Sequence, residues 1–262
     1  MTLQLFQVDA FTNEVFGGNP AAVCPLTAWL RSDEMQNIAM ENNLAETAFY
    51  CRDDNGTYTI RWFTPTLEVD LCGHATLAAA HVMFNHQGYS NDEIVFKSRS
   101  GALRVLRNGQ WLKLDFPTDT IREVPLTSEL VECFDLKPNH AWRGKTDFML
   151  IFENEEQIRN LRPDFNRIQK LSSRGIIVTA KGTETDFVSR FFAPQSGINE
   201  DPVTGSAHTS LIPYWANRLM KEELTALQVS ARGGYLVCGF QGDRVLISGQ
   251  AKTYLIGEIY TA

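Results

Sequence analysis

The sequence repeats itself at half its length, and this repeat constrains the fold more than any other feature. Placing Phe63-Thr64-Pro65 over Phe192-Ala193-Pro194, an offset of 129 residues, aligns more than the tripeptide. Further along, Gly73 falls on Gly205, and the offset drifts only to 133 near the end of each half. The other matched pairs are Ala48-Phe49-Tyr50 with Ile177-Val178-Thr179, Gly101 with Gly234, and Gly109 with Gly242. A collinear set of this kind predicts two copies of one structural unit.

Local patterns predict the same order of elements in both halves: a helix, two strands, a helix of small residues and a hairpin. These elements are expected near 32–39, 45–51, 57–63, 73–85 and 101–117, and again near 163–171, 175–180, 186–192, 205–220 and 233–249. The two helices that begin at Gly73 and Gly205 are apolar nearly all round, which is typical of buried helices. Pro213 is expected to kink the second of them.

We therefore predict an α+β fold of two pseudo-symmetric lobes, residues 1–117 and 118–262. Each lobe is expected to be a mostly antiparallel sheet wrapped around its central helix. The chain has 262 residues, and at about 150 residues per domain this length suits two small domains or one large one.

Composition excludes several classes of function. The formal net charge is −7, so neither nucleic-acid binding nor polybasic attachment to a membrane is expected, because both need a cationic surface. No apolar run approaches the ~20 residues that span a bilayer, and the first residues lack the pattern of a signal peptide. The five cysteines form no CxxC pair, which argues against a disulfide framework or a zinc knuckle. We expect a cytoplasmic protein.

The openings of the two small-residue helices are the first candidate site. The segments 68–76 and 199–208 both place acidic residues, a glycine and a hydroxyl or imidazole there. Free backbone N–H groups at a helix N-terminus bind anions, and Gly73, Gly205 and Ser206 are therefore predicted to bind a substrate carboxylate between the two helices. Neither segment contains Arg or Lys, so neutral dipoles are expected to hold the anion.

Glu46 is the second candidate, as a general acid/base. It lies in an otherwise uncharged segment, 42–51, that has the pattern of a half-buried strand. Desolvation raises the pKa of a carboxyl toward the range useful for proton transfer. The repeat aligns Glu46 with Gly175, so no second acid is expected at the equivalent position.

With these residues in view, the chain resembles the phenazine-biosynthesis PhzF-like family, which has the diaminopimelate-epimerase-like fold. The resemblance covers essentially the whole chain and rests on Val8-Asp9-Ala10-Phe11, Gly17-Gly18-Asn19-Pro20-Ala21-Ala22-Val23, Asn43-Leu44-Ala45-Glu46-Thr47-Ala48-Phe49, Gly73-His74-Ala75-Thr76 and 200–208. It implies a two-lobed homodimer that works without a metal or an organic cofactor. It further implies that Glu46 is the catalytic acid/base and that His74, Asp201 and Ser206 hold the substrate; Asn19, in the second motif, is added to the predicted substrate-binding residues.

The function expected from this resemblance is isomerisation of a small carboxylate substrate, which can be cyclic. Glu46 is expected to move a proton between two of its carbons. One alternative is a ligand-binding or protein-interaction module that keeps the fold without turnover. Another is an amino-acid racemase or epimerase, since racemases that share this fold carry a cysteine at each helix opening. Cys72 occupies the first such position, but the second holds Thr204, whose hydroxyl is a weak acid/base unless a base lies beside it.

Overall fold

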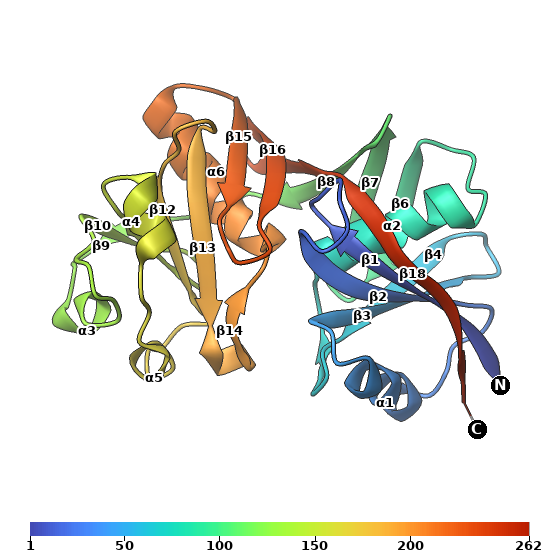
Figure 1. Cartoon of the computed structure of the whole chain (residues 1–262). Coiled ribbons are helices and arrows are strands. Elements are labelled where there is room, and N and C mark those ends of the chain that lie inside the picture. The colour runs from blue at the N-terminus through green and yellow to red at the C-terminus, as the bar shows by residue number, and fades with distance from the viewer. Residues whose placement is uncertain (262) are drawn as a thin grey trace. The chain divides into compact units, whose positions relative to one another are not determined.

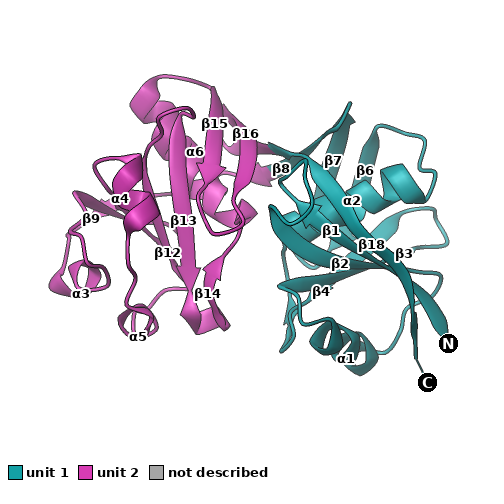
Figure 2. Cartoon of the chain, in the orientation of Figure 1, with its two compact units in different colours: residues 1–115, 248–262 teal, residues 116–247 magenta. Residues whose placement is uncertain are grey.

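The computed structural model describes residues 1–261, and its contacts divide the chain into two compact units (Figure 1, Figure 2). The first comprises residues 1–115 and 248–262, and the second comprises residues 116–247. The sequence-based division into 1–117 and 118–262 placed the last residues in the second lobe. They lie in the first unit because the final strand, β18 (Ala251–Tyr260), pairs along its length with β1 (Thr2–Ala10).

The first unit is one mixed sheet with two helices. Its other elements are β2 (Asn19–Leu26), α1 (Ser32–Asn42), β3 (Glu46–Arg52), β4 (Tyr58–Phe63), β5 (Glu68–Val69), α2 (Gly73–His86), β6 (Glu93–Ser98), β7 (Gly101–Asn108) and β8 (Trp111–Pro117). The strands are hydrogen-bonded in the order β18, β1, β2, β3, β4, β6, β7, β8. All neighbours are antiparallel except β2 with β3 and β4 with β6.

The second unit repeats this arrangement. Its elements are β9 (Arg122–Val124), α3 (Ser128–Val131), β10 (His140–Arg143), β11 (Phe148–Ile151), α4 (Glu155–Asn160), α5 (Phe165–Ile168), β12 (Ile176–Lys181), β13 (Phe187–Ala193), η1 (Pro194–Ser196), β14 (Ile198–Asp201), α6 (Gly205–Leu219), β15 (Glu223–Gln228), β16 (Gly234–Gln241) and β17 (Arg244–Gly249). Strands β10 to β13, β15 and β16 alternate antiparallel and parallel pairing in the same order as β1 to β4, β6 and β7. The repeat in the sequence is thus a repeat of topology, and the predicted α+β fold is confirmed.

The two small-residue helices are buried as predicted. In α2, ten of fourteen residues are buried, and the helix packs against β1, β2 and β3. In α6, nine of fifteen are buried, and the helix packs against β15 and β16. The helix α6 continues from Gly205 to Leu219 through Pro213, so the proline does not end it. Each sheet therefore packs around a buried helix. The polar segments 68–76 and 199–208 lead into the N-termini of α2 and α6.

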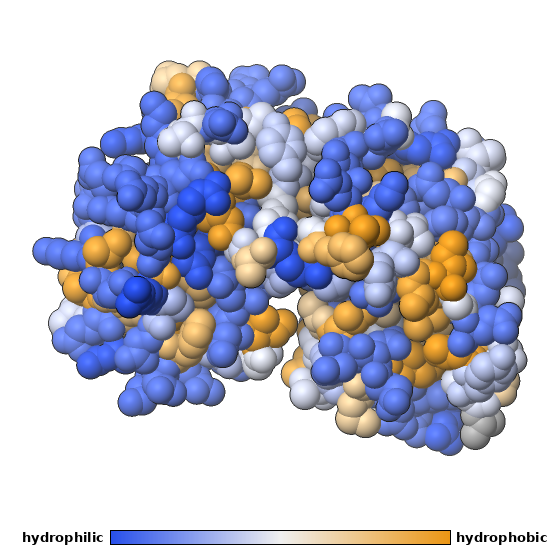
Figure 3. All heavy atoms as spheres, viewed as in Figure 1, coloured by the Kyte–Doolittle hydropathy of each residue, from blue (hydrophilic) through white to orange (hydrophobic). Residues whose placement is uncertain are grey.

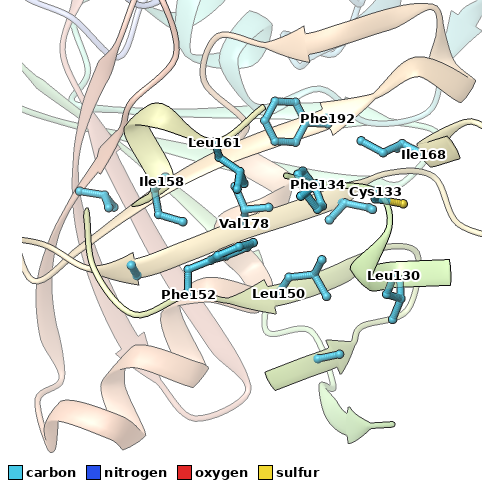
Figure 4. Packing of buried hydrophobic residues seen from close by; sticks show 14 residues of the cluster. Leu130, Cys133, Phe134, Leu150, Phe152, Ile158, Leu161, Ile168, Val178 and Phe192 are labelled. Carbon is cyan, nitrogen blue, oxygen red and sulfur yellow. The ribbon is translucent and has the colours of Figure 1, made fainter. Parts of the chain in front are cut away.

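The core of the second unit gathers residues from segments with little sequence signal. Figure 4 shows Phe134, Phe152, Ile158 and Phe192 in one cluster: Phe192 belongs to β13 and Ile158 to α4, and Phe152 directly follows β11. The strand β12 has five buried residues in a row, as expected for a strand covered on both faces. The helix predicted over 163–171 is shorter: α5 spans only Phe165–Ile168.

The turn between β1 and β2 is held by a backbone that only glycine fits. Gly18 has φ +61°, and a Cβ there would lie 2.1 Å from the carbonyl oxygen of Ala10. The carboxylate of Asp9 accepts a hydrogen bond from the N–H of Phe16 at 2.9 Å across the same turn. This turn fixes the start of β2, and therefore the position of Asn19.

No helix within residues 1–261 combines the length and the apolar character that crossing a bilayer requires.

Candidate functional site

Glu46 opens β3, and the sequence around it explains its position. The helix α1 ends at Asn43, which adopts the left-handed conformation with φ 48° and closes the helix through its N–H. Asn42 then donates a side-chain hydrogen bond to Thr47 at 3.0 Å, and Glu46 pairs with Ala21 of β2. The side chain of Glu46 is 15% exposed, so the predicted half-buried carboxyl is present.

His74, the second residue of α2, faces this carboxyl. Its Nε2 lies 3.1 Å from Oε2 of Glu46, yet neither atom makes an aligned hydrogen bond with any of residues 1–261. Burial by itself would lower the pKa of His74, but the nearby Cys72 and Glu46 raise it well above its usual value. An imidazole beside a carboxylate is an arrangement suited to proton transfer and to hydrogen bonding of a substrate.

Two further side chains surround the imidazole. Asn19 is completely buried, and its amide nitrogen lies 3.2 Å from Nδ1 of His74. The thiol of Cys72 lies 3.6 Å from the same ring nitrogen. Burial and the charge of Glu46 raise the pKa of Cys72, although His74 partly offsets them. Asn19, predicted to bind substrate, therefore orients the His74 ring in this structure.

In the second unit, Ser206 is the second residue of α6, the position that His74 has in α2. Its Oγ accepts a hydrogen bond from Nη1 of Arg174 at 2.9 Å. The guanidinium of Arg174 also forms a two-point ion pair with Asp147, whose side chain is almost fully buried. Burial opposes the charge on Arg174, but Asp147 and the nearby Asp201 and Asp119 raise its pKa.

The segment between β14 and α6 is fixed by Gln228 at the end of β15. Oε1 of this fully buried glutamine accepts the N–H of Thr204 at 2.8 Å, and its amide nitrogen donates to the carbonyl of Asp201 at 2.8 Å. The Thr204 hydroxyl donates to the Asp201 carboxylate at 2.6 Å. Thr204, at the second helix opening, thus has a carboxylate beside it, and its hydroxyl is held in a hydrogen bond to that group.

The position that the repeat aligns with Glu46 is closed to side chains. A Cβ on Gly175 would lie 2.5 Å from the ring of Phe191 and 2.7 Å from the carbonyl oxygen of Phe192. The neighbouring residue is Arg174, so the second unit carries a cation beside the position where the first carries an acid. The two halves share a fold but differ in the chemistry of their sites.

Within each unit the structure brings predicted residues together. Glu46, His74 and Asn19 form one group with Gly73 at the opening of α2, and Asp201, Gly205 and Ser206 lie at the opening of α6. Sequence reasoning missed Arg174, Asp147 and Gln228. Neither motif contains a cation, but the structure places one beside Ser206, because Arg174 contacts its hydroxyl from outside the motif.

His208, also in the second motif, has a structural role. Its Nδ1 donates to the carbonyl of Thr204 at 2.8 Å, and burial lowers its pKa from 6.5 to about 4. Between these two pH values an unfolded chain binds a proton at this residue that the folded chain excludes, so acidification favours unfolding. We expect His208 to remove about 2 kcal/mol of unfolding free energy between pH 7 and pH 5.

Urea unfolding at both pH values measures this loss. His208→Gln should flatten the pH dependence, whereas His140→Gln, which changes an exposed histidine, should leave it unaltered. Equal slopes for wild type and His208→Gln would contradict the assignment. His81, whose pKa burial also lowers to about 4, contributes to the slope that remains, whereas His74, whose pKa is raised, acts in the opposite direction.

Comparison with known proteins identifies the family of the chain. A sequence model of the PhzC-PhzF family, described as phenazine biosynthesis-like protein, matches residues 8–257. The chain belongs to this family. It is similar to a protein of Pseudomonas aeruginosa named as an uncharacterised isomerase, with 52% identity over 259 residues and 99% of each chain covered. It is also similar to the crystal structure of a PhzF-family phenazine biosynthesis protein of Enterococcus faecalis, with a TM-score of 0.97, 46% identity and full coverage of both chains.

The relatives also bear on the reaction class of this PhzF-family chain. Three curated relatives that are 45–52% identical to it are named isomerases, and the chain is an enzyme of that class. A hydroxyproline epimerase of Agrobacterium vitis has a TM-score of 0.61 at 10% identity, covering 98% of this chain and 92% of the other. That likeness concerns the fold alone.

Proposed function

We propose that this isomerase moves a proton on a small carboxylate substrate, with Glu46 as its single acid/base. The observation that carries the proposal is the pairing of a half-buried Glu46 carboxyl with His74 at the opening of a buried helix. Gly175 supports the proposal of a single acid/base, because a side chain at this position, which the repeat aligns with Glu46, would collide with Phe191 and Phe192. One carboxyl that takes a proton from one carbon and returns it to another needs no second base.

The roles of the neighbours follow from their contacts. His74, whose pKa Cys72 and Glu46 raise, would hydrogen-bond the substrate and stabilise charge that develops during proton transfer. Asn19 would hold the imidazole ring in place from its buried position. Gly73 would present backbone N–H groups of α2 to the substrate, because the first turn of a helix leaves such donors without intrahelical partners.

In the second unit we propose that Asp201, Gly205 and Ser206 bind a substrate carboxylate. Arg174 already donates to the Ser206 oxygen, so the hydroxyl hydrogen of Ser206 is directed elsewhere and can donate to a carboxylate. A hydrogen bond to a charged group contributes about 1.5–3 kcal/mol, whereas one between neutral groups contributes less. Arg174 therefore acts as a positioning residue for Ser206.

Ser206→Ala should weaken binding of an aromatic carboxylate such as benzoate by about tenfold, since one donor to an anion is lost. Arg174→Gln should weaken it to a similar extent, because the Ser206 hydroxyl loses the group that orients it. Isothermal titration calorimetry measures both effects. Ser210→Ala is the matched control on the same helix, because that hydroxyl donates to Asp119 instead; equal loss in all three variants would argue against the site.

The experiment that tests the function is hydrogen exchange. The protein is incubated in deuterium oxide with a panel of cyclic and amino-acid carboxylates, and deuterium incorporation is followed by proton NMR. Replacement of a carbon-bound hydrogen by deuterium supports the proposed isomerase activity. Binding without exchange for every ligand that binds would favour a non-catalytic binding module, and inversion of an α-carbon would favour a racemase.

We further propose that the enzyme requires no metal or organic cofactor and that it forms a homodimer. The observation that supports a dimer is a set of exposed apolar side chains on β18, namely Tyr254, Leu255, Ile256 and Tyr260. Figure 3 shows apolar atoms gathering on the face of the first unit that β18 crosses. Contiguous apolar surface of this kind is typical of protein–protein contacts.

A further inference from the structure

A cavity of about 370 Å³ lies in the first unit, near the C-terminal end of α2. Met83 and Gln87 line it from the helix side, together with the start of β1 and the end of β2. Met83 follows His74 by nine residues, and a helix rises about 14 Å over that length. Small-molecule sites typically enclose about 300–1,000 Å³. The cavity is therefore separate from the proposed acid/base group and large enough for a small ligand.

Three tyrosine rings line this cavity. The ring centre of Tyr58 lies 6.1 Å from that of Tyr50 and 5.9 Å from that of Tyr89, with interplanar angles of 72° and 73°. Leu26 and Met83 add aliphatic and thioether surface. Aromatic rings attract further rings in edge-to-face and offset arrangements, and sulfur also contacts rings favourably. The lining therefore suits a flat aromatic ligand.

Arg52, the last residue of β3, gives the cavity its charge. Among residues 1–261 it is the one charged residue that lines the cavity. Its guanidinium carbon lies 5.9 Å from the centre of the Tyr58 ring, and within the described chain no hydrogen bond or ion pair engages the guanidinium. A planar guanidinium binds a carboxylate through two parallel hydrogen bonds. The free charge therefore favours an anionic group on the ligand.

The hydroxyl of Tyr50 indicates where a second polar group of the ligand would be favourable. The side chain of Tyr50 is 4% exposed, and its buried hydroxyl makes no hydrogen bond with any of the residues that the structure describes. Buried polar atoms without partners are rare and unfavourable. Tyr50 and Arg52 are two residues apart on β3 and so lie on the same face of the strand. An acceptor on the ring of a ligand would give the Tyr50 hydroxyl a partner while its carboxylate pairs with Arg52.

We propose that this cavity is a binding site for an aromatic carboxylate, distinct from the group formed by Glu46 and His74. The carboxylate of the ligand pairs with Arg52, and its ring packs against the tyrosines and Met83. The proposal concerns binding alone, so it does not depend on the reaction that the enzyme catalyses.

Methionine methyl NMR tests the site with 2-naphthoate as the probe. The chain has six methionines, and labelling them with ¹³C at the methyl group gives a small set of signals, of which Met83→Leu identifies the one from the cavity. Addition of 2-naphthoate should shift the Met83 signal, because the bound ring changes the local magnetic field. Met149, on β11 of the second unit, serves as the internal reference and should not shift.

Arg52→Gln should weaken the binding measured at Met83 by about tenfold or more, since a hydrogen-bonded charge pair is lost. Arg31→Gln is the matched control: this arginine directly precedes α1, its side chain is 80% exposed, and the cavity lining does not include it. 2-Naphthalenemethanol, which has the same ring system without the charge, should also bind at least about tenfold more weakly than 2-naphthoate.

Three results would overturn the proposal: no shift of the Met83 signal at millimolar 2-naphthoate, equal binding by the wild type and Arg52→Gln, or equal binding of the alcohol and the carboxylate. Ser206→Ala separates this site from the proposed substrate site. It should leave the Met83 titration unchanged, and a matching loss in Ser206→Ala would show that the shift reports binding at the opening of α6 instead.

Discussion

Glu46→Gln is expected to lower the rate of deuterium exchange by about 100-fold or more, the usual contribution of a general acid/base. Glutamine keeps the shape of the side chain and its place at the start of β3, but an amide cannot carry the proton. Binding of a carboxylate ligand should remain within a few fold of the wild type, since the residues proposed to bind the carboxylate are unchanged. NMR exchange rates and titration calorimetry separate the two effects.

Glu41→Gln is the matched control for this change. Glu41 lies five residues earlier, on α1, and is exposed, so the same change in charge there should leave the exchange rate unaltered. An unimpaired Glu46→Gln enzyme would show that another group transfers the proton. A variant that loses binding and exchange together would indicate that Glu46 holds the substrate rather than reacting with it.

Gly18→Ala is expected to destabilise the protein by about 3 kcal/mol. The left-handed backbone at φ +61° is unfavourable for alanine by about 1–2 kcal/mol. The new Cβ would in addition lie 2.1 Å from the Ala10 carbonyl oxygen and 2.8 Å from the Thr12 side chain, and overpacking of this kind typically costs about 1–3 kcal/mol. Chemical denaturation measures the loss.

Gly109→Ala isolates the steric part of that loss. Gly109 has φ +60° and no atom within 4 Å of the position of a Cβ, so only the backbone penalty of about 1 kcal/mol is expected. If both alanine variants lose the same free energy of unfolding, the close contacts of the new Cβ at Gly18 do not contribute to the destabilisation. The turn also fixes Asn19 and through it His74, so any residual activity of folded Gly18→Ala should be reduced.

The fold was largely predictable because its information is local and repeated. Alternating and small-residue patterns identified the strands and central helices of both halves, and the offset of 129 residues related them. The first two strands and β18 were not predicted. Residues 6–10 of β1 do alternate between apolar and polar, which is a signal for a strand. The pairing of β1 with β18 joins residues about 250 positions apart, and no local pattern reports it.

The site was predictable where its residues lie in motifs. Glu46, His74, Asp201 and Ser206 were identified from the segments around them. Asp147 and Gln228 were missed because their partners, Arg174 and Thr204, lie 27 and 24 residues away along the chain, and only strand pairing brings them together. A signal for Arg174 did exist: it immediately precedes Gly175, the residue that the repeat places over Glu46.

The return of β18 to the first unit sets an order in which the protein can be made. On the ribosome, residues 116–247 emerge before residues 251–260. The second unit therefore has all of its residues while the sheet of the first still lacks β18, the strand that pairs with β1. Domains generally fold as units during synthesis, and here the unit that begins first finishes last. Until β18 arrives, the unpaired edge of β1 is exposed to other chains, and Glu46 and His74 belong to a unit that is still incomplete.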